Sequence, residues 1–222
     1  MRLLLFGGSG AMGVLLARRF LAAYPQCTLI LYVRDKLKLA ADLVGARTVV
    51  IVEGELNAID KLSQAMEGVH AVISALGPTG RKGPFYPAGT PIAVAYGFII
   101  LAMKKHDVRR LIVLTTPTVR DDEDGFSLPL VFLRKTFATI ARNVVKDIEA
   151  VGKVVRETDL DWTLIRLALH SDDGGGGEHE IVAGYMGDGR IKPVSSRAGA
   201  ATFIIDELER REWIRKAPIL SN

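Results

Sequence analysis

The chain has 222 residues, of which 49% are hydrophobic and 24% are charged; these values allow a well-packed core and exclude disorder throughout. Lys and Arg total 29 against 25 for Asp and Glu, so the net charge is +4, and no stretch is basic enough for a nucleic-acid-binding arm. A single cysteine, Cys27, excludes an internal disulfide and a zinc site built from CxxC pairs.

The sequence predicts a soluble, cytoplasmic protein. No apolar stretch approaches the roughly 20 residues of a membrane span. The short apolar N-terminus leads into glycines rather than into a signal-peptide cleavage site. We expect a small-molecule substrate, no nucleic-acid or membrane partner, no metal, and a monomer or weak homodimer.

Short apolar runs alternate with stretches of helical periodicity along the chain. Strands are predicted at residues 2–6, 28–33, 48–52, 69–75, 110–115 and 162–166. Helices are predicted at 11–23, 57–66, 91–106 and 197–211, and a long helix within 130–158. Asn57 is the expected N-cap of the second helix. The segments 77–89, 120–129 and 171–180 have the composition of loops.

Nearly continuous apolar strands separated by helices indicate a parallel sheet that is buried on both faces. Right-handed crossovers then predict an α/β fold with a doubly wound, mostly parallel sheet, a three-layer α/β/α sandwich of the Rossmann type. We expect one domain over residues 1–222, with a substrate pocket formed by loops 77–89, 116–129 and 167–195. The four glycines at 174–177 are better explained as a surface insertion.

Three glycines follow the first predicted strand with the spacing GxxGxxG, at Gly7, Gly10 and Gly13, and a helix begins at once. In this context the pattern is typical of a dinucleotide-binding turn. Gly7 and Gly10 allow the backbone to approach a diphosphate without a Cβ in the way. The N–H groups of the first helical turn then bind the phosphates, and Gly13 allows close packing on the sheet. A plain strand-to-helix turn needs only one glycine, so we favour a dinucleotide.

Charged residues follow the second predicted strand, with Arg34 first, then Asp35 and Lys36, and Lys38 beyond. In a dinucleotide fold this position lies beside the adenosine ribose, where an acid binds the 2′-hydroxyl of NAD and an arginine accommodates the 2′-phosphate of NADP. Arg34 can hold a phosphate with two hydrogen bonds. We therefore expect NADP(H) rather than NAD(H), with Asp35 facing away. Lys36 and Lys38 are also explained as solvated charges.

Several segments together resemble the atypical short-chain dehydrogenase/reductase superfamily. Within it, they are most similar to the small NAD(P)-binding, NmrA-like proteins that include the flavin and biliverdin-IXβ reductases. The segments are LLLFGGSGAMG, VRD, EGEL, AVISALG, VRRLIVLTT, TDLDWTLIR and SSRAGAATFIIDEL, and they cover nearly the whole chain. The glycine loop and DWTLIR are fairly specific to the superfamily, whereas no segment is specific to one substrate.

The resemblance implies which residues bind the cofactor. The phosphate loop consists of Gly7, Ser9, Gly10, Ala11 and Met12, and the 2′-phosphate clamp of Arg34 with Lys38 nearby. Adenine is flanked by Glu55 and Leu56, where Glu55 replaces the usual Asp. The diphosphate and nicotinamide ribose run along Ala75, Leu76 and Gly77. The nicotinamide lies beside Thr115 and Thr116, and beside the turn at Leu167 and Ala168, which lacks the usual proline.

The catalytic pair that is usual in the superfamily, Tyr-x-x-x-Lys, is missing from the helix after the fifth strand. The spacing occurs only at Tyr32–Lys36, at the end of the second strand, where it is explained by chance. The catalytic candidates are therefore Lys146, Thr116 and His170. Lys146 either binds the ribose or acts as an acid–base group, or it is a solvated helix lysine. His170 either donates a proton or is an ordinary loop histidine.

Two functions fit these features. The first is an NADPH-dependent reductase of a planar or electrophilic small molecule, such as a flavin, quinone, enone or natural-product intermediate, or a tailoring isomerase as a variant. Such acceptors need little acid catalysis from the enzyme. The second is a non-catalytic, redox-sensing regulator that binds NADP(H). The loop after the fourth strand carries Arg81, Lys82, Phe85 and Tyr86, which can attract and stack on a substrate and so favour the enzyme.

Overall fold

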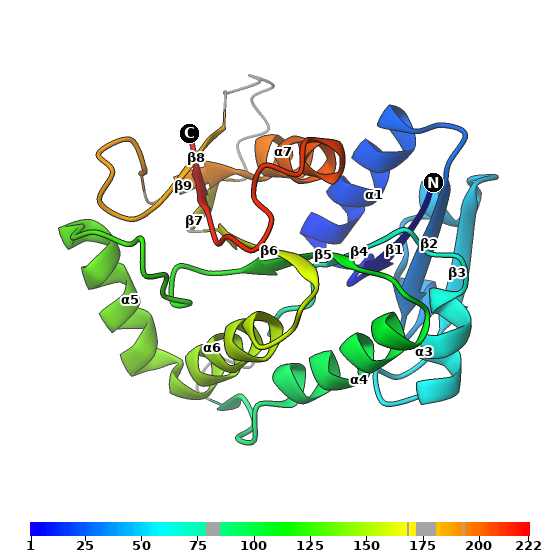
Figure 1. The fold of residues 1–222 in the computed structure, drawn as a ribbon, viewed down its shortest axis with the longest axis horizontal. Helices are drawn as coiled ribbons and strands as arrows, with labels where there is room; N and C mark the ends of the chain where they lie inside the picture. The colour runs from blue at the N-terminus through cyan, green and yellow to red at the C-terminus, as the bar shows by residue number, and fades with distance from the viewer. Residues whose placement is uncertain (79–84, 168, 172–180, 193) are drawn as a thin grey trace.

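The computed structural model describes residues 1–78, 85–167, 169–171, 181–192 and 194–222 (Figure 1). The strands are β1 (Arg2–Phe6), β2 (Thr28–Val33), β3 (Val49–Glu53), β4 (Ala71–Ser74), β5 (Arg110–Thr115), β6 (Asp161–Leu167), β7 (Leu169–Ser171), β8 (Val182–Gly184), β9 (Val194–Ser196) and β10 (Ile219–Ser221). The helices are α1 (Ala11–Ala23), η1 (Lys36–Lys38), α2 (Ala41–Val44), α3 (Ile59–Met66), α4 (Pro91–Lys105), α5 (Leu128–Ile140), α6 (Arg142–Arg156) and α7 (Arg197–Arg210).

The main sheet has eight strands in the order β3-β2-β1-β4-β5-β6-β10-β8. All neighbours are parallel except β8, which runs antiparallel to β10. A separate pair, β7 and β9, is also parallel. The chain moves outward from β1 to β3, returns to the other side of β1 at β4, and then moves outward again, which is the doubly wound topology. The predicted fold class is therefore confirmed.

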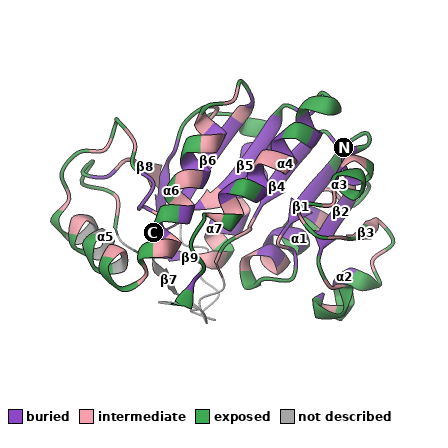
Figure 2. Cartoon of the chain, turned by 90° about the horizontal axis from the view of Figure 1, so that it is seen from below, coloured by how far each residue is buried: buried purple, intermediate pink, exposed green. Residues whose placement is uncertain are grey.

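Helices cover both faces of the sheet, α1 and α7 on one side and α3, α4 and α6 on the other (Figure 1). Each face of the sheet has its own hydrophobic core, and successive side chains of β1 point alternately into one and the other. Leu3 and Leu5 pack on the side of α1 and α7, while Leu4 and Phe6 pack on the side of α3, α4 and α6. The central strands are accordingly buried along their length (Figure 2). Burial on both faces is why these strands are continuous apolar runs in the sequence.

Several elements differ from the sequence-based expectation. The long helix expected within 130–158 is two helices, because Ala141 leaves the helical conformation (φ −128°, ψ 49°) between α5 and α6. The helix expected to begin at Asn57 begins at Ile59, because the Glu55 carbonyl accepts the Ala58 N–H at 3.0 Å and closes a turn there. The strands β7 to β10 were not predicted, since three residues are too few to form a periodic pattern.

Among the described residues, no helix is both long and apolar enough to cross a membrane.

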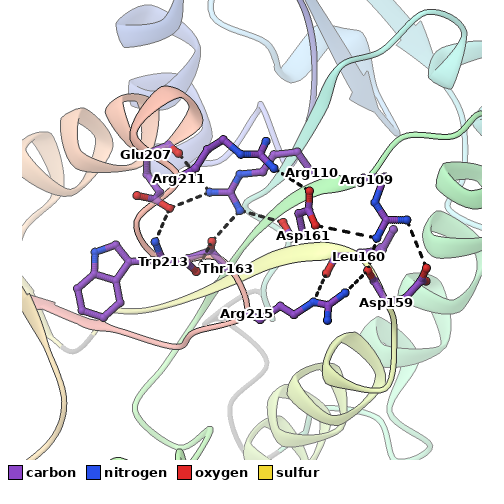
Figure 3. A network of polar contacts seen from close by, with 10 residues as sticks. All are labelled: Arg109, Arg110, Asp159, Leu160, Asp161, Thr163, Glu207, Arg211, Trp213 and Arg215. Carbon is purple, nitrogen blue, oxygen red and sulfur yellow. Dashed lines mark hydrogen bonds and ion pairs between the residues drawn. The ribbon is translucent and has the colours of Figure 1, made fainter.

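A buried polar network joins α7 and the segment after it to the amino ends of β5 and β6 (Figure 3). Arg110 Nη2 lies 3.0 Å from Glu207 Oε1, and both side chains are almost fully buried. Arg110 also donates to Thr163 Oγ1, while Glu207 accepts the Trp213 N–H at 2.9 Å. Burial lowers the pKa of the Arg110 guanidinium to about 10, although the Glu207 charge opposes the shift.

We expect Glu207→Ala to lower the free energy of unfolding by about 3–5 kcal/mol, because it leaves the buried Arg110 charge without its partner. Glu157→Ala is the matched control, since Glu157 forms an exposed pair with Lys153 at 3.9 Å, and should change stability by less than about 1 kcal/mol. Replacing both buried partners, with Arg110→Met and Glu207→Leu, should recover much of the loss. Urea denaturation gives the free energy of unfolding of wild type and of the three variants, and equal effects of the two single changes would contradict the assignment.

Candidate cofactor-binding site

The carboxyl ends of five parallel strands lie side by side, because β2, β1, β4, β5 and β6 are neighbours in that order. The residues at or just after these ends are Gly7, Arg34, Ala75, Thr116 and Leu167. All five are residues that the sequence predicted for the site. The strand order reverses between β1 and β4, and in open α/β sheets the ligand crevice forms at such a reversal.

The turn between β1 and α1 is packed so closely that two of its positions, Gly7 and Gly13, accept only glycine. Gly7 has a φ of +79°, and a Cβ there would lie 2.7 Å from the carbonyl oxygen of Ala75. A Cβ on Gly13 would overlap the carbonyl oxygen of Gly7. Gly10 is different, since its N–H donates to the Gly7 oxygen at 3.0 Å and a Cβ on it would meet only that oxygen, at 3.4 Å.

The first turn of α1 is open to an anion. Gly10 is the N-cap and supplies no side-chain hydrogen bond, and the turn contains no acidic residue. Ser9, Gly10 and Ala11 are exposed and Met12 is half-buried. Main-chain N–H groups at such an end, together with the helix dipole, bind phosphate without further side chains. The geometry leaves this turn open to a diphosphate.

The two candidate ribose contacts after β2 have different environments. The Asp35 carboxylate accepts the Leu37 N–H at 3.0 Å and lies 3.3 Å from Lys38 Nζ. These contacts, the Leu37 hydrogen bond first, hold the pKa of Asp35 below its usual value. Arg34 is exposed and forms no ion pair within the described part of the chain. The contacts of the Asp35 carboxylate are therefore with residues of its own turn, one of which is Lys38. Arg34, in contrast, is available to bind a ligand.

The segment after β3 is held by two side chains that the sequence did not point to. Tyr32 Oη donates to the Glu55 carbonyl at 2.8 Å, and Lys61 Nζ donates to the Glu53 carbonyl at 2.7 Å. Gly54 packs against the Tyr32 ring so closely that a Cβ would overlap the phenol oxygen. The Glu55 side chain remains exposed and Leu56 is half-buried. Tyr32 therefore supports the segment where adenine is expected.

The ends of β4 and β5 are tied by hydroxyl groups. The buried Tyr96 phenol of α4 donates to Ser74 Oγ at 2.6 Å. Thr115 is buried and donates to the Ile165 carbonyl at 3.1 Å, which joins β5 to β6. The hydroxyl of the half-buried Thr116 lies 2.7 Å from that of Thr118. Beyond β4, Ala75 and Leu76 are half-buried and Gly77 is exposed.

Of the catalytic candidates, Lys146 is exposed on α6 and has no ion-pair partner within the described residues. Its neighbour Asp147 is fully buried and was not predicted. The Asp147 carboxylate accepts the N–H groups of Ile92 and Ala93 at 3.0 and 2.9 Å and the Tyr86 hydroxyl at 2.6 Å. It therefore caps α4, whose own N-cap residue supplies no side-chain hydrogen bond. This cap fixes the segment that leads from β4 into α4.

Other predicted residues lie at the limits of what the structure describes. Leu167 is buried at the end of β6. Ala168, Arg81 and Lys82 lie outside the described residues. His170 belongs to β7, opposite Ser195 of β9, and only its backbone is described.

A buried ion pair secures the segment after β5. Arg166 of β6 is fully buried and donates to both carboxylate oxygens of Asp124, at 2.5 and 2.8 Å. The same guanidinium donates to the Val119 carbonyl at 3.1 Å, and Asp124 accepts the Met186 N–H at 3.1 Å. Burial acts to raise the pKa of Asp124, but the Arg166 hydrogen bonds and charge outweigh it, so the pKa is lowered.

A surface groove of about 580 Å³ lies between this segment and the second half of α6, away from the glycine turn. Its lining carries both signs of charge and consists of Thr118, Val119, Arg120, Glu149, Lys153, Arg156 and Glu157. Three of the lining residues, Thr118, Val119 and Arg120, belong to the loop 116–129 that is expected to line a substrate pocket. In the described residues, no group of three or more His, Cys, Asp or Glu side chains is placed to bind a metal ion.

None of the five tyrosines is suited to act as a proton donor of lowered pKa. Burial raises the pKa of all five, Tyr24, Tyr32, Tyr86, Tyr96 and Tyr185. For Tyr86, the one tyrosine in the segment after β4, the hydrogen bond to Asp147 raises the pKa further. The site can orient a bound cofactor and acceptor, but it offers no activated phenol.

Comparison with known proteins extends over the whole chain. A family model of NAD(P)H-binding proteins matches residues 7–211. A short-chain dehydrogenase/reductase from Veillonella parvula, solved in complex with NADP, is 20% identical with a TM-score of 0.78, over 100% of this chain and 94% of that one. A Rossmann-fold NAD(P)-binding family protein from Shigella flexneri is 18% identical with a TM-score of 0.74, over 100% and 93%.

ChuY, an anaerobillin reductase from Escherichia coli, is 18% identical with a TM-score of 0.72, over 100% of this chain and 97% of that one. No curated protein sequence matches the chain. The likeness to these solved structures confirms the Rossmann-type fold.

We expect the stability contributed by Asp124 to depend on pH. Its pKa is lowered in the folded state, so the contribution is fully present above the unfolded value of about 3.9 and is lost as the pH falls through the folded value. Wild type should therefore unfold at higher urea than Asp124→Asn at pH 7, and the difference should shrink below about pH 4. Asp122→Asn, at an exposed neighbour, is the control. A difference that does not change with pH would contradict the charged pairing.

Proposed function

Because the chain belongs to the NAD(P)H-binding family, we propose that it is an NADPH-dependent oxidoreductase that reduces a planar or electrophilic small molecule. The observation that carries the proposal is the open first turn of α1, which lies at the reversal of strand order and has a glycine, Gly10, at its N-cap. Bound NADPH would supply a hydride, and this chain would orient the donor against the acceptor.

The preference for NADP(H) rests on the contrast between Arg34 and Asp35. Asp35 accepts hydrogen bonds from its own turn and is thereby withdrawn from a ribose hydroxyl. Arg34 is exposed at the end of β2 and free to hold a 2′-phosphate. The solved relative from Veillonella parvula binds NADP, which supports the same choice.

The class of acceptor follows from what the site lacks. The hydroxyl groups of Tyr32, Tyr86 and Tyr96 donate to acceptors within the protein, so none of these three phenols is placed to protonate an alkoxide. A flavin, quinone or conjugated enone accepts hydride into a delocalised system, and water can then supply the proton. The exposed Phe85, next to the fixed Tyr86, offers a flat apolar surface for such an acceptor. Lys146, Thr116 and His170 remain candidates for contact with it. ChuY, an anaerobillin reductase of the same fold, supports a reductive role.

We expect Arg34→Ala to weaken NADPH binding by about 10- to 100-fold and to leave NADH binding unchanged, since a charged hydrogen bond contributes about 1.5–3 kcal/mol. Arg47→Ala, at another exposed arginine near β3, should change neither. Isothermal titration calorimetry gives the dissociation constants. Equal affinities for both cofactors that do not respond to Arg34→Ala would remove the NADP preference.

We expect NADPH oxidation, followed by nicotinamide absorbance, to require one of a panel of flavins, quinones and enones. Gly10→Glu places a carboxylate where the diphosphate would bind and should abolish both turnover and cofactor binding, while Gly45→Ala, with space for a Cβ, should abolish neither. Tight NADPH binding with no turnover on any acceptor would contradict the enzyme and would favour the second function, a non-catalytic redox-sensing regulator. Failure of both cofactors to bind would refute both functions.

A further inference from the structure

Two residues of α6 hold Tyr86 at two separate points. The Tyr86 hydroxyl donates to Asp147 Oδ2 at 2.6 Å, and Asn143 Nδ2 donates to the Tyr86 carbonyl at 3.0 Å. Asn143 and Asp147 are four residues apart and therefore lie on the same face of α6. The side chain and the main chain of Tyr86 are thus both fixed by one helix, although 57 and 61 residues separate Tyr86 from these partners.

The Asp147 carboxylate also ties this point to α4, which lies beside α6 on one face of the sheet (Figure 1). It accepts the N–H groups of Ile92 and Ala93 at 3.0 and 2.9 Å. A fully buried carboxylate is stabilised in this position by three hydrogen bonds and by the amino-terminal end of the α4 dipole. One side chain therefore joins Tyr86, the first turn of α4 and α6.

These contacts lie beyond the carboxyl end of β4. The Tyr96 hydroxyl of α4 donates to Ser74, which is the last residue of β4, so this turn of α4 is level with the end of the strand. Helix α4 runs from the end of β4 back to the start of β5. Ile92 precedes Tyr96 by four residues and lies about 6 Å nearer the start of the helix. Asp147 and Tyr86 are therefore above the carboxyl edge of the sheet, where the ligand crevice is expected.

Phe85 lies directly before the residue that α6 holds. It is 88% exposed, the largest fraction among the large apolar side chains that the structure describes. A single exposed apolar side chain is common on protein surfaces. Phe85 differs from such residues because it is located at the crevice and because its neighbour Tyr86 is buried and fixed at both ends. A ring that is exposed and anchored in this way is suited to stack on a flat ligand.

We propose that Asp147 is a positioning residue for the acceptor. It holds the Tyr86 hydroxyl and thereby fixes Phe85, on which the planar acceptor stacks. Asn143 assists by holding the main chain of Tyr86. This inference rests on the proposed reductase function, and it adds to that function the ring that the acceptor contacts and the buried carboxylate that keeps the ring in place.

The link between Asp147 and Phe85 is tested with Tyr86→Phe. Asp147→Ala would also remove the cap of α4, whereas Tyr86→Phe removes one hydroxyl and leaves the bonds from Ile92 and Ala93 in place. We expect Tyr86→Phe to raise the KM for the acceptor about fivefold. Phe85→Ala should raise it about tenfold.

The effect should be confined to the acceptor. Stacking in the ground state and in the transition state alike changes KM and leaves kcat within about twofold. The KM for NADPH should not change in either variant, and Phe85→Tyr, which keeps the ring, should retain the wild-type acceptor KM. Tyr24→Phe is the matched control, because the Tyr24 hydroxyl bonds to Glu209 beyond the carboxyl-terminal end of α1, and it should change no kinetic constant.

The double variant with Phe85→Ala and Tyr86→Phe separates positioning from a purely structural role. If Tyr86 acts through Phe85, the second change adds nothing once the ring is absent. A purely structural role would instead lower activity by the same factor whichever residue occupies position 85. Binding of riboflavin to the NADP⁺-loaded protein, followed by flavin fluorescence, gives a readout that needs no turnover, and its Kd should follow the same pattern.

The outcomes distinguish this inference from the proposed function. Turnover of riboflavin or menadione with an acceptor KM that neither Phe85→Ala nor Tyr86→Phe changes would overturn the inference and leave the reductase standing. Additive effects in the double variant would do the same. Riboflavin binding that depends on Phe85 and Tyr86 without any turnover would support the positioning role and contradict the reductase. A wild type that binds NADPH but neither binds nor reduces these acceptors would overturn both.

Discussion

Backbone packed directly against backbone at the start of α1 fixes the positions of the other site elements. A Cβ at Gly13 would overlap the Gly7 oxygen, and a Cβ at Gly7 would press on the Ala75 carbonyl, so α1, β1 and β4 approach one another at distances that only glycine permits. This close packing places the first N–H groups of α1 at the carboxyl edge of the sheet, between β1 and β4, where the strand order reverses. Arg34 and the segment after β3 lie along the same edge because β2 and β3 continue the sheet outward from β1.

Phenol and carboxylate groups give this edge its rigidity. Tyr32 holds the segment after β3, Tyr96 holds the end of β4, and Asp147 holds both Tyr86 and the first turn of α4. Each phenol donates its proton to the protein itself, and burial raises its pKa. Tyr32, Tyr86 and Tyr96 are therefore structural supports of this edge of the sheet.

The sequence predicted the central sheet well and the polar supports poorly, for physical reasons. Bounds for β1, β2 and β5 agree to the residue, since strands buried on both faces are unbroken apolar runs. The glycine turn was predicted because its spacing and context are local. Asp147 was not, because a charged residue on an amphipathic helix is normally solvated, and its partners on α4 are 54 and 55 residues away. The Arg166–Asp124 pair spans 42 residues and carries no local pattern either.

The position of β10 imposes an order on assembly during vectorial synthesis. β10 is later in the chain than β8 but lies between β6 and β8 in the sheet. While the ribosome is still making residues 185–218, β8 has no neighbouring strand to join and β6 has one unoccupied side. The pairing therefore allows β1 to β6 to join as they are made, whereas β8 can enter the sheet only after β10 has been added beside β6.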